Sequence, residues 1–288
     1  NAGTGDVVLK AHQNIIDADV TDPVAADVQG NNITLTSLLG GIGGAGADLE
    51  IDSRRNSTGV VNFSGLFGSL YVQELVGDLY LDQVGTGSTA FAFITAAGGA
   101  IYDGRTDTTK KNITSGKVRL MANTAIGTSS APIVSAISNV EGKSQSGSTY
   151  IDNTGSLTVG GVVPGATIGM ESTGSIRIVT HSPINVWLPI IAATDVQLLA
   201  TEKLAAGDDI TITATGSVTT TGGKIQLLAG DNVSIANSSS LTATDYIEIR
   251  SGYNDMDTDG STISIGAAMT APLIEIHGTE YADTITLT

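Results

Sequence analysis

The chain has 288 residues, of which 36 are Gly, 15 % are charged and 4 % are aromatic, and its net charge is −16. Low charge and few aromatic residues do not suit a conventional α/β enzyme, whereas abundant Gly with 41 % apolar residues suits many short strands and turns. The acidic balance argues against nucleic-acid binding, which needs clustered Lys and Arg. Disulfides and thiolate metal sites are excluded because there is no Cys. No apolar stretch approaches the ~20 residues of a membrane helix.

Alternating apolar and polar residues define the first strands. Segments 5–10, 30–36 and 47–52 have apolar side chains at every second position, which predicts strands with one buried face. The Gly-rich segment 38–47 between them predicts a tight corner. A phosphate-binding loop is not indicated there, because no Lys closes the segment.

Residues 60–105 are more apolar and contain several of the aromatic side chains. We expect these side chains to fill a wider part of the core. The alternative is a carbohydrate platform, in which Tyr71, Tyr80 and Tyr102 stack on sugar rings.

Residues 106–150 are polar and less periodic, and basic residues such as Lys110 and Lys111 occur among them. We predict an irregular insertion that leaves the regular fold. A basic binding spot is the alternative interpretation.

From residue 151 the alternating segments return, and after Asp195 they follow one another as near copies. The step from Val196 to Ile225, Ile247 and Ile274 is roughly 22 to 29 residues, which is typical of stacked coils. A strand of about five residues cannot bury its apolar face alone, but coils stacked about 4.8 Å apart pair each strand with its neighbours.

This repeat predicts an all-β fold, a parallel β-helix or β-solenoid of about eleven coils. We expect a single domain over 1–288, with N-terminal coils over 1–105, an insertion over 106–150 and C-terminal coils over 151–288. Because the chain begins at Asn1 without Met or a signal peptide, we expect a mature or excised piece.

The sharpest candidate site is the segment Asp255–Gly260. Carboxylates at alternate positions, closed by Gly, form the first half of a calcium loop. The twelfth position is Gly266 where an EF-hand has Glu. We therefore predict an isolated corner in which Asp255, Asp257 and Asp259 bind calcium, with an acidic corner between strands as the alternative.

Other acidic residues gather at predicted corners. One group comprises Asp17, Asp19, Asp22 and Asp27, and the second comprises Asp208, Asp209 and Asp231. Stacked corner carboxylates repel one another unless a cation or water lies between them. These groups favour calcium in general without placing it.

Catalytic patterns are weak. The residues His12, His181 and His277 have no metal-ligand spacing, no Gly-x-Ser-x-Gly nucleophile motif occurs, and spacing selects no pair of carboxylates for glycoside hydrolysis. We predict that the protein is not an enzyme and has no catalytic residues. The alternative is a polysaccharide lyase or hydrolase on the same scaffold.

The run from Gly207 to Thr220, echoed from Gly230, resembles the repeats of filamentous-haemagglutinin-like adhesins. The final segment 277–288 resembles the entry into an RTX-type calcium-binding repeat, although the Gly-Gly-x-Gly-x-Asp nonapeptide is absent.

The resemblance implies a right-handed β-helix from a large bacterial extracellular protein, secreted or attached to the cell surface, in a structural, adhesive or biofilm-matrix role. As partners we expect head-to-tail copies of the chain or neighbouring repeats, because open solenoid ends could stack into a stiff rod, filament or surface layer. Cell-surface glycans are further candidate partners, and neither nucleic acid nor membrane insertion is expected.

Overall fold

The structure is a computed structural model that describes residues 1–18, 25–203, 206–254, 256, 260–279, 281 and 283–288. Within these ranges the fold is all-β, with parallel strands in stacked coils that form a β-solenoid of about 12 turns. The predicted fold class is confirmed. The described ranges contain no helix that could span a membrane.

The chain divides into two compact units. Unit 1 comprises residues 1–137 and 143–146, and unit 2 comprises residues 138–142 and 147–288. That the chain is a single domain, and that its coils are right-handed, stay predictions.

Unit 1 contains two main parallel ladders. One joins β1, β3, β5 and β7, and the other joins β4, β6, β8 and β10. The strands of this unit are β1 (Val7–Ala11), β2 (Val28–Gln29), β3 (Ile33–Ser37), β4 (Leu49–Asp52), β5 (Val61–Gly65), β6 (Leu70–Glu74), β7 (Leu79–Thr86), β8 (Phe91–Ala96), β9 (Ile101–Asp103), β10 (Ile113–Ala122) and part of β11 (Ile133–Ser144).

Alternate side chains of these strands fill the interior of unit 1. Strands β3, β5 and β6 each bury every second residue, as the sequence pattern predicts. Ile33 and Leu35 are fully buried, and Phe63 packs inside on the next coil.

The expected irregular insertion over 106–150 is corrected by the structure. This segment holds the two longest strands, β10 and β11. Strand β10 pairs with β7 through Ile113 and Thr114, and with β8 through residues 117–122. At the junction, Ser115 and Gly116 are buried consecutively, so the strand turns from one ladder to the next and its alternation is lost.

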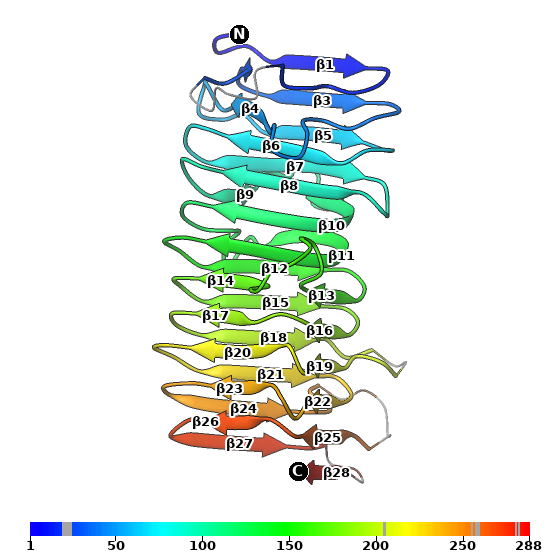
Figure 1. Cartoon of the computed structure of the whole chain (residues 1–288), viewed down its shortest axis with the longest axis vertical. Helices are drawn as coiled ribbons and strands as arrows, with labels where there is room; N and C mark the ends of the chain where they lie inside the picture. Colours follow the sequence, from blue (N-terminus) through cyan, green and yellow to red (C-terminus); the bar gives the residue numbers. More distant parts are fainter. Residues whose placement is uncertain (19–24, 204–205, 255, 257–259, 280, 282) are drawn as a thin grey trace. The chain divides into compact units, whose positions relative to one another are not determined.

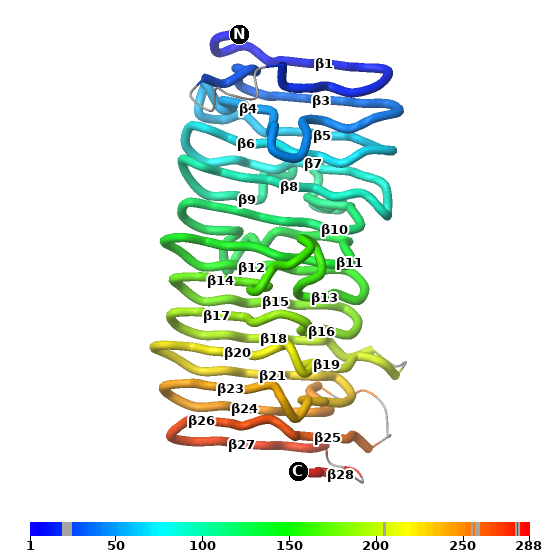
Figure 2. Tube along the Cα trace, viewed as in Figure 1, coloured from blue at the N-terminus to red at the C-terminus, as the bar shows by residue number. Residues whose placement is uncertain are grey.

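The coils of unit 2 are stacked in order (Figures 1 and 2). From β12 to β26 each coil has three strands, and β27 and β28 follow. Three parallel ladders run through it, headed by β12, β13 and β14. Its strands are β12 (Thr149–Asn153), β13 (Leu157–Val159), β14 (Met170–Ser172), β15 (Ile176–Thr180), β16 (Ile184–Val186), β17 (Ile190–Ala192), β18 (Val196–Ala200), β19 (Ile210–Ile212), β20 (Ser217–Thr220), β21 (Ile225–Ala229), β22 (Val233–Ile235), β23 (Ser240–Thr242), β24 (Tyr246–Arg250), β25 (Thr262–Ile265), β26 (Ala268–Thr270), β27 (Leu273–His277) and β28 (Thr284–Leu287).

The register predicted from the repeat is confirmed. Val196 pairs with Ile225, Ile225 with Ile247, and Ile247 with Ile274. Apolar side chains therefore stack on apolar side chains along the inside of each ladder, which is the burial that single short strands cannot achieve.

Polar side chains form a matching ladder on the outside of unit 2. Arg177 Nε donates to Gln197 at 2.7 Å, Gln197 to Gln226 at 3.3 Å, and Gln226 to Glu248 at 2.7 Å. The outer face thus links four successive coils through side chains as well as through the backbone.

Many corner carboxylates accept hydrogen bonds from the backbone of the neighbouring coil. Asp195 accepts from the N–H of Lys224 at 3.0 Å, and Asp209 accepts from the N–H of Asn232 at 3.0 Å. The same arrangement recurs at Asp6, Asp78 and Asp283. Acidic corners therefore need no cation in general, because backbone N–H groups stabilise their charge.

Candidate cation site and surface groove

The predicted calcium ligands Asp255, Asp257 and Asp259 lie outside the described residues. Their role in calcium binding stays a prediction.

A different group of carboxylates converges in unit 2. Glu202 follows β18, Asp208 precedes β19, and Asp231 lies between β21 and β22. One carboxylate oxygen of each residue lies within 4.8 Å of the others. We call these three residues the corner cluster. A divalent cation with oxygen ligands could be held there.

The backbone fixes the corner cluster in place. Asp231 Oδ2 accepts hydrogen bonds from the N–H groups of Gly207 at 2.5 Å and Asp208 at 2.7 Å. Glu202 packs against Gly230, where an added Cβ would lie 2.5 Å from Glu202 Oε2. Gly at position 230 therefore leaves the space that the Glu202 carboxylate occupies.

Asp208 is the most buried member of the cluster, with 3 % of its surface exposed. Burial raises the pKa of Asp208, and the neighbouring charges of Asp231 and Asp209 act in the same direction. The charge of Lys203 and its backbone N–H act against this rise. Asp208 Oδ2 is buried and has no hydrogen-bond partner within the described ranges.

Sequence reasoning singled out Asp208 and Asp231 but missed Glu202. A signal was present, because Ala200 pairs with Ala229 and the same register continued by two residues places Glu202 beside Asp231. The Gly-Asp pattern at this corner identified Asp231 but not Glu202, its neighbour in the preceding coil.

The acidic group near the start of the chain is also partly brought together. A carboxylate oxygen of each of Asp17, Asp27 and Glu50 lies within 4.8 Å of the others, whereas Asp19 and Asp22 fall outside the described residues. Burial raises the pKa of Glu50 to about 7, and the charges of Asp27 and Asp17 contribute to that rise. A proton held by Glu50 can relieve the repulsion in this group without a metal ion.

A groove of about 700 Å³ lies on the surface of unit 1. Outward-facing polar side chains of β3, β5 and β7 line it, together with the loop that carries Lys110 and Lys111. The lining includes Thr34, Thr36, Asn62, Ser64 and Gln83. Neutral hydrogen-bonding groups with two nearby lysines could bind a polar ligand.

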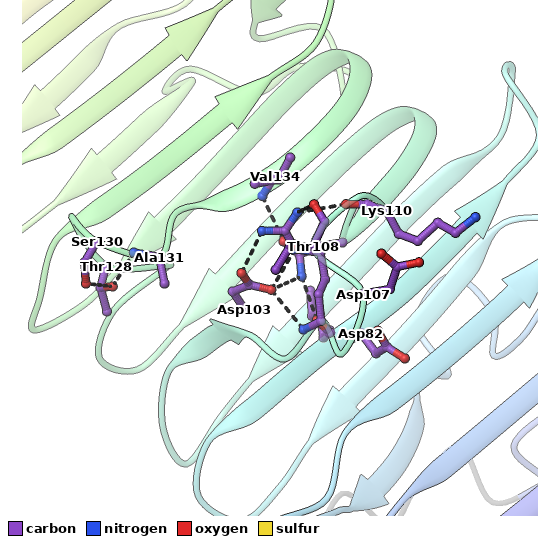
Figure 3. Close-up of polar contacts among 12 residues, drawn as sticks. Asp82, Asp103, Asp107, Thr108, Lys110, Thr128, Ser130, Ala131 and Val134 are labelled. Atoms are coloured by element: carbon purple, nitrogen blue, oxygen red, sulfur yellow. Dashed lines mark hydrogen bonds and ion pairs between the residues drawn. The ribbon is translucent and has the colours of Figure 1, made fainter.

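The loop that borders this groove is held by an ion pair (Figure 3). Arg105 donates to Asp103 from Nε at 2.9 Å and from Nη2 at 2.8 Å, and Arg105 Nη1 donates to the carbonyl of Lys110 at 2.8 Å. Although burial acts to raise it, hydrogen bonds from Arg105 and Asn112 hold the pKa of Asp103 below its usual value. The groove therefore has a fixed wall.

The aromatic side chains of unit 1 pack on one another between coils. The rings of Tyr71 and Phe93 are stacked with centroids 4.8 Å apart, and the Arg54 guanidinium lies 3.7 Å from the centroid of Tyr80. The ring of Tyr80 also lies beside that of Tyr102, with centroids 5.2 Å apart. These contacts occupy ring surface that the alternative carbohydrate platform would need.

The histidines have separate environments. His181 Nε2 lies 3.2 Å from Asp152, and His277 Nε2 lies 3.8 Å from Glu275. His12 lies in unit 1 and is exposed. The structure gives each its own surroundings, and the absence of catalysis stays a prediction.

Comparisons with models of protein families, with curated proteins and with solved structures give no match to this chain. The fold and the sites described above define the class, an acidic parallel β-solenoid with a carboxylate cluster at one corner.

Proposed function

We propose that the chain is a structural or adhesive segment of a secreted bacterial surface or matrix protein. The observation that carries this proposal is the continuity of the ladders in unit 2, in which β12, β15, β18, β21, β24 and β27 pair in one unbroken series. The strand ladders join successive coils through backbone hydrogen bonds. The fold resists extension because two coils cannot separate without breaking a whole set of these bonds together.

The resemblance to filamentous-haemagglutinin-like adhesins supports the same role. The run that carries it spans β19 and β20, two strands of the regular coil. Of the RTX-like segment 277–288, His277 ends β27 and residues 284–287 form β28. Both motifs belong to the coil architecture, as expected of a repeat protein whose function is mechanical.

A partner that adds a further coil belongs to the same proposal. Leu273 on β27 is 52 % exposed, and Leu287 on β28 is 62 % exposed. Another copy of the chain or a neighbouring repeat is the proposed partner, and stacking would give a stiff rod or filament. Cell-surface glycans are proposed as further partners of the assembled surface. A calcium ion at Asp255, Asp257 and Asp259 belongs to this proposal as a stabiliser.

Single-molecule stretching tests the structural role. The chain is held at its two ends between globular marker domains of known unfolding force. We expect units 1 and 2 to resist at forces above those of the markers and to extend in cooperative steps. Gradual extension without resolved force peaks would contradict the proposal.

The groove favours a second candidate function, a polysaccharide lyase or hydrolase. Anionic and neutral polysaccharides are incubated with the protein, and reducing ends and unsaturated sugars are measured, with the variant Lys110→Ala as a control. We expect no product. Product formation that Lys110→Ala reduces would favour the enzyme over the structural segment.

A further inference from the structure

We propose that Glu202, Asp208 and Asp231 form a calcium site that joins successive coils of unit 2. This site is distinct from the segment 255–259, and the inference stands whether or not the chain has the proposed structural role.

The first argument is the unpartnered oxygen of Asp208. Its Oδ2 is buried without a hydrogen-bond partner in the described part of the chain, and Asp208 is 3 % exposed. A buried charged oxygen without a partner is costly. Neighbouring corners avoid this cost through backbone N–H donors, as Asp209 does with Asn232. The Asp208 carboxyl group has a backbone N–H donor in Lys203, but its Oδ2 is left without one. Asp208 faces two further carboxylates, so a cation is the partner that fits.

The second argument is charge. Three carboxylates and the nearby ammonium group of Lys203 leave an excess of two negative charges when all are ionised. A divalent cation balances this excess. Asp209 adds a further negative charge close by, which its contacts with Asn232 partly offset.

The third argument is the choice of ion. All ligand atoms in the cluster are carboxylate oxygens, which favours hard cations. Calcium takes six to eight oxygens at about 2.3–2.6 Å in flexible geometry, whereas magnesium requires a near-ideal octahedron and retains its water. Oxygens within 4.8 Å of one another are in reach of a shared calcium ion. The corners are irregular, so calcium is the better match.

The site would act as a clamp between coils. Glu202 and Asp208 flank one corner, and Asp231 comes from the corner of the next coil. Asp231 already links the two corners, because its carboxylate accepts hydrogen bonds from the N–H groups of Gly207 and Asp208. Bound calcium would add a second link at the same place.

The test is calorimetric titration with calcium chloride, combined with thermal melting in calcium or in chelator. Asp208→Asn removes the buried charge with little change in shape, and Asp209→Asn is the matched control at the adjacent residue. We expect Asp208→Asn to lose one calcium ion per chain and its share of the calcium-dependent rise in Tm. In chelator we expect it to melt at or above the temperature of the wild type, because the repulsion is relieved.

At a free calcium concentration one hundred times Kd, occupation of the site shifts the unfolding equilibrium about a hundredfold. Asp209→Asn should retain this shift. Should Asp208→Asn fail to fold, Glu202→Gln provides the same test through a second ligand. The proposal is overturned if the wild type binds no calcium at millimolar concentration, if Asp208→Asn binds as many ions as the wild type, or if magnesium gives an equal shift.

Discussion

The backbone N–H of Ser53 donates to both carboxylate oxygens of Glu74, at 3.0 and 3.1 Å. Glu74 ends β6 and is fully buried. Burial raises its pKa to about 7 despite these hydrogen bonds. The folded protein therefore holds a proton on this side chain at pH values at which the unfolded chain has lost it.

This relationship predicts how the stability of unit 1 depends on pH. Because the folded pKa of Glu74 is above the unfolded value of 4.5, the native state binds more protons between these values. The free energy of unfolding then rises as pH falls from about 8 to about 5. Glu74→Gln should remove the Glu74 part of this dependence, leave the part due to Glu50, whose pKa is also raised to about 7, and stabilise the protein by up to about 3 kcal/mol at pH 8.

Urea denaturation at pH 5, 6, 7 and 8 checks this prediction. The control is Glu275→Gln on β27, where the carboxylate is 47 % exposed, and this variant should keep the pH dependence of the wild type. An unchanged pH slope in Glu74→Gln would contradict the assignment.

The core of unit 2 gives a second prediction. Leu227 is fully buried and lies in register between Leu198 and Ile249. Leu227→Ala would leave a cavity between three coils and cost about 2–5 kcal/mol. Ser234→Ala, at an exposed position of β22, should change stability by less than about 0.5 kcal/mol. Chemical denaturation of both variants measures the difference, and equal losses would argue against a shared interior.

Two glycines separate backbone strain from steric contact. Gly43 and Gly46 both have positive φ, 66° and 78°. A Cβ at Gly43 would lie 2.1 Å from the carbonyl oxygen of Tyr71, whereas a Cβ at Gly46 would meet nothing within 4 Å.

Gly46→Ala should therefore cost only the left-handed conformation, about 1–2 kcal/mol, and Gly43→Ala should cost distinctly more because the coils must move apart. The difference in Tm between the two variants tests whether β6 stacks on the corner that contains Gly43. Similar Tm values would count against that contact.

The ion pair of Arg105 and Asp103 gives a fourth prediction, on loop order. Arg105→Lys loses the forked contact with Asp103, and we expect exchange of the amides of 104–112 to become about tenfold faster, as for the loss of one charge-assisted hydrogen bond. Arg55→Lys is the matched control. Arg55 is 42 % exposed and lies 2.6 Å from Asp52, and exposed pairs contribute little.

Hydrogen exchange followed by mass spectrometry resolves both loops. A loop over 104–112 that exchanges equally in wild type and Arg105→Lys would show that the groove wall is held by other contacts.

The sequence predicted most of unit 2 because most of its short strands bury alternate residues, as β12, β18 and β24 do. It failed over 106–150 for a local reason. In β10 the consecutive buried residues Ser115 and Gly116 mark a bend between two ladders, and a Cβ at Gly116 would lie 2.1 Å from the carbonyl oxygen of Ser88. Such a bend is set by the neighbouring coil and leaves no periodic signature.

The candidate sites were likewise predicted only in part. Asp208 and Asp231 were predicted as corner acids, since Gly-Asp precedes the strand in each repeat. Their convergence with Glu202 depends on which corners come into register, and that follows from the pairing of β18 with β21. The groove beside Lys110 depends on the path of a loop over the strands, which the composition of the loop does not specify.

The pairing of side chains along unit 2 has a consequence for sequence change. Gln197 meets Arg177 across 20 residues on one side and Gln226 across 29 residues on the other, yet both contacts join equivalent strand positions. Equivalent positions in successive coils are therefore set by strand pairing and not by a fixed number of residues. Insertions and deletions can accumulate at the corners of this protein, and new binding loops can arise there, while the spacing between coils stays constant.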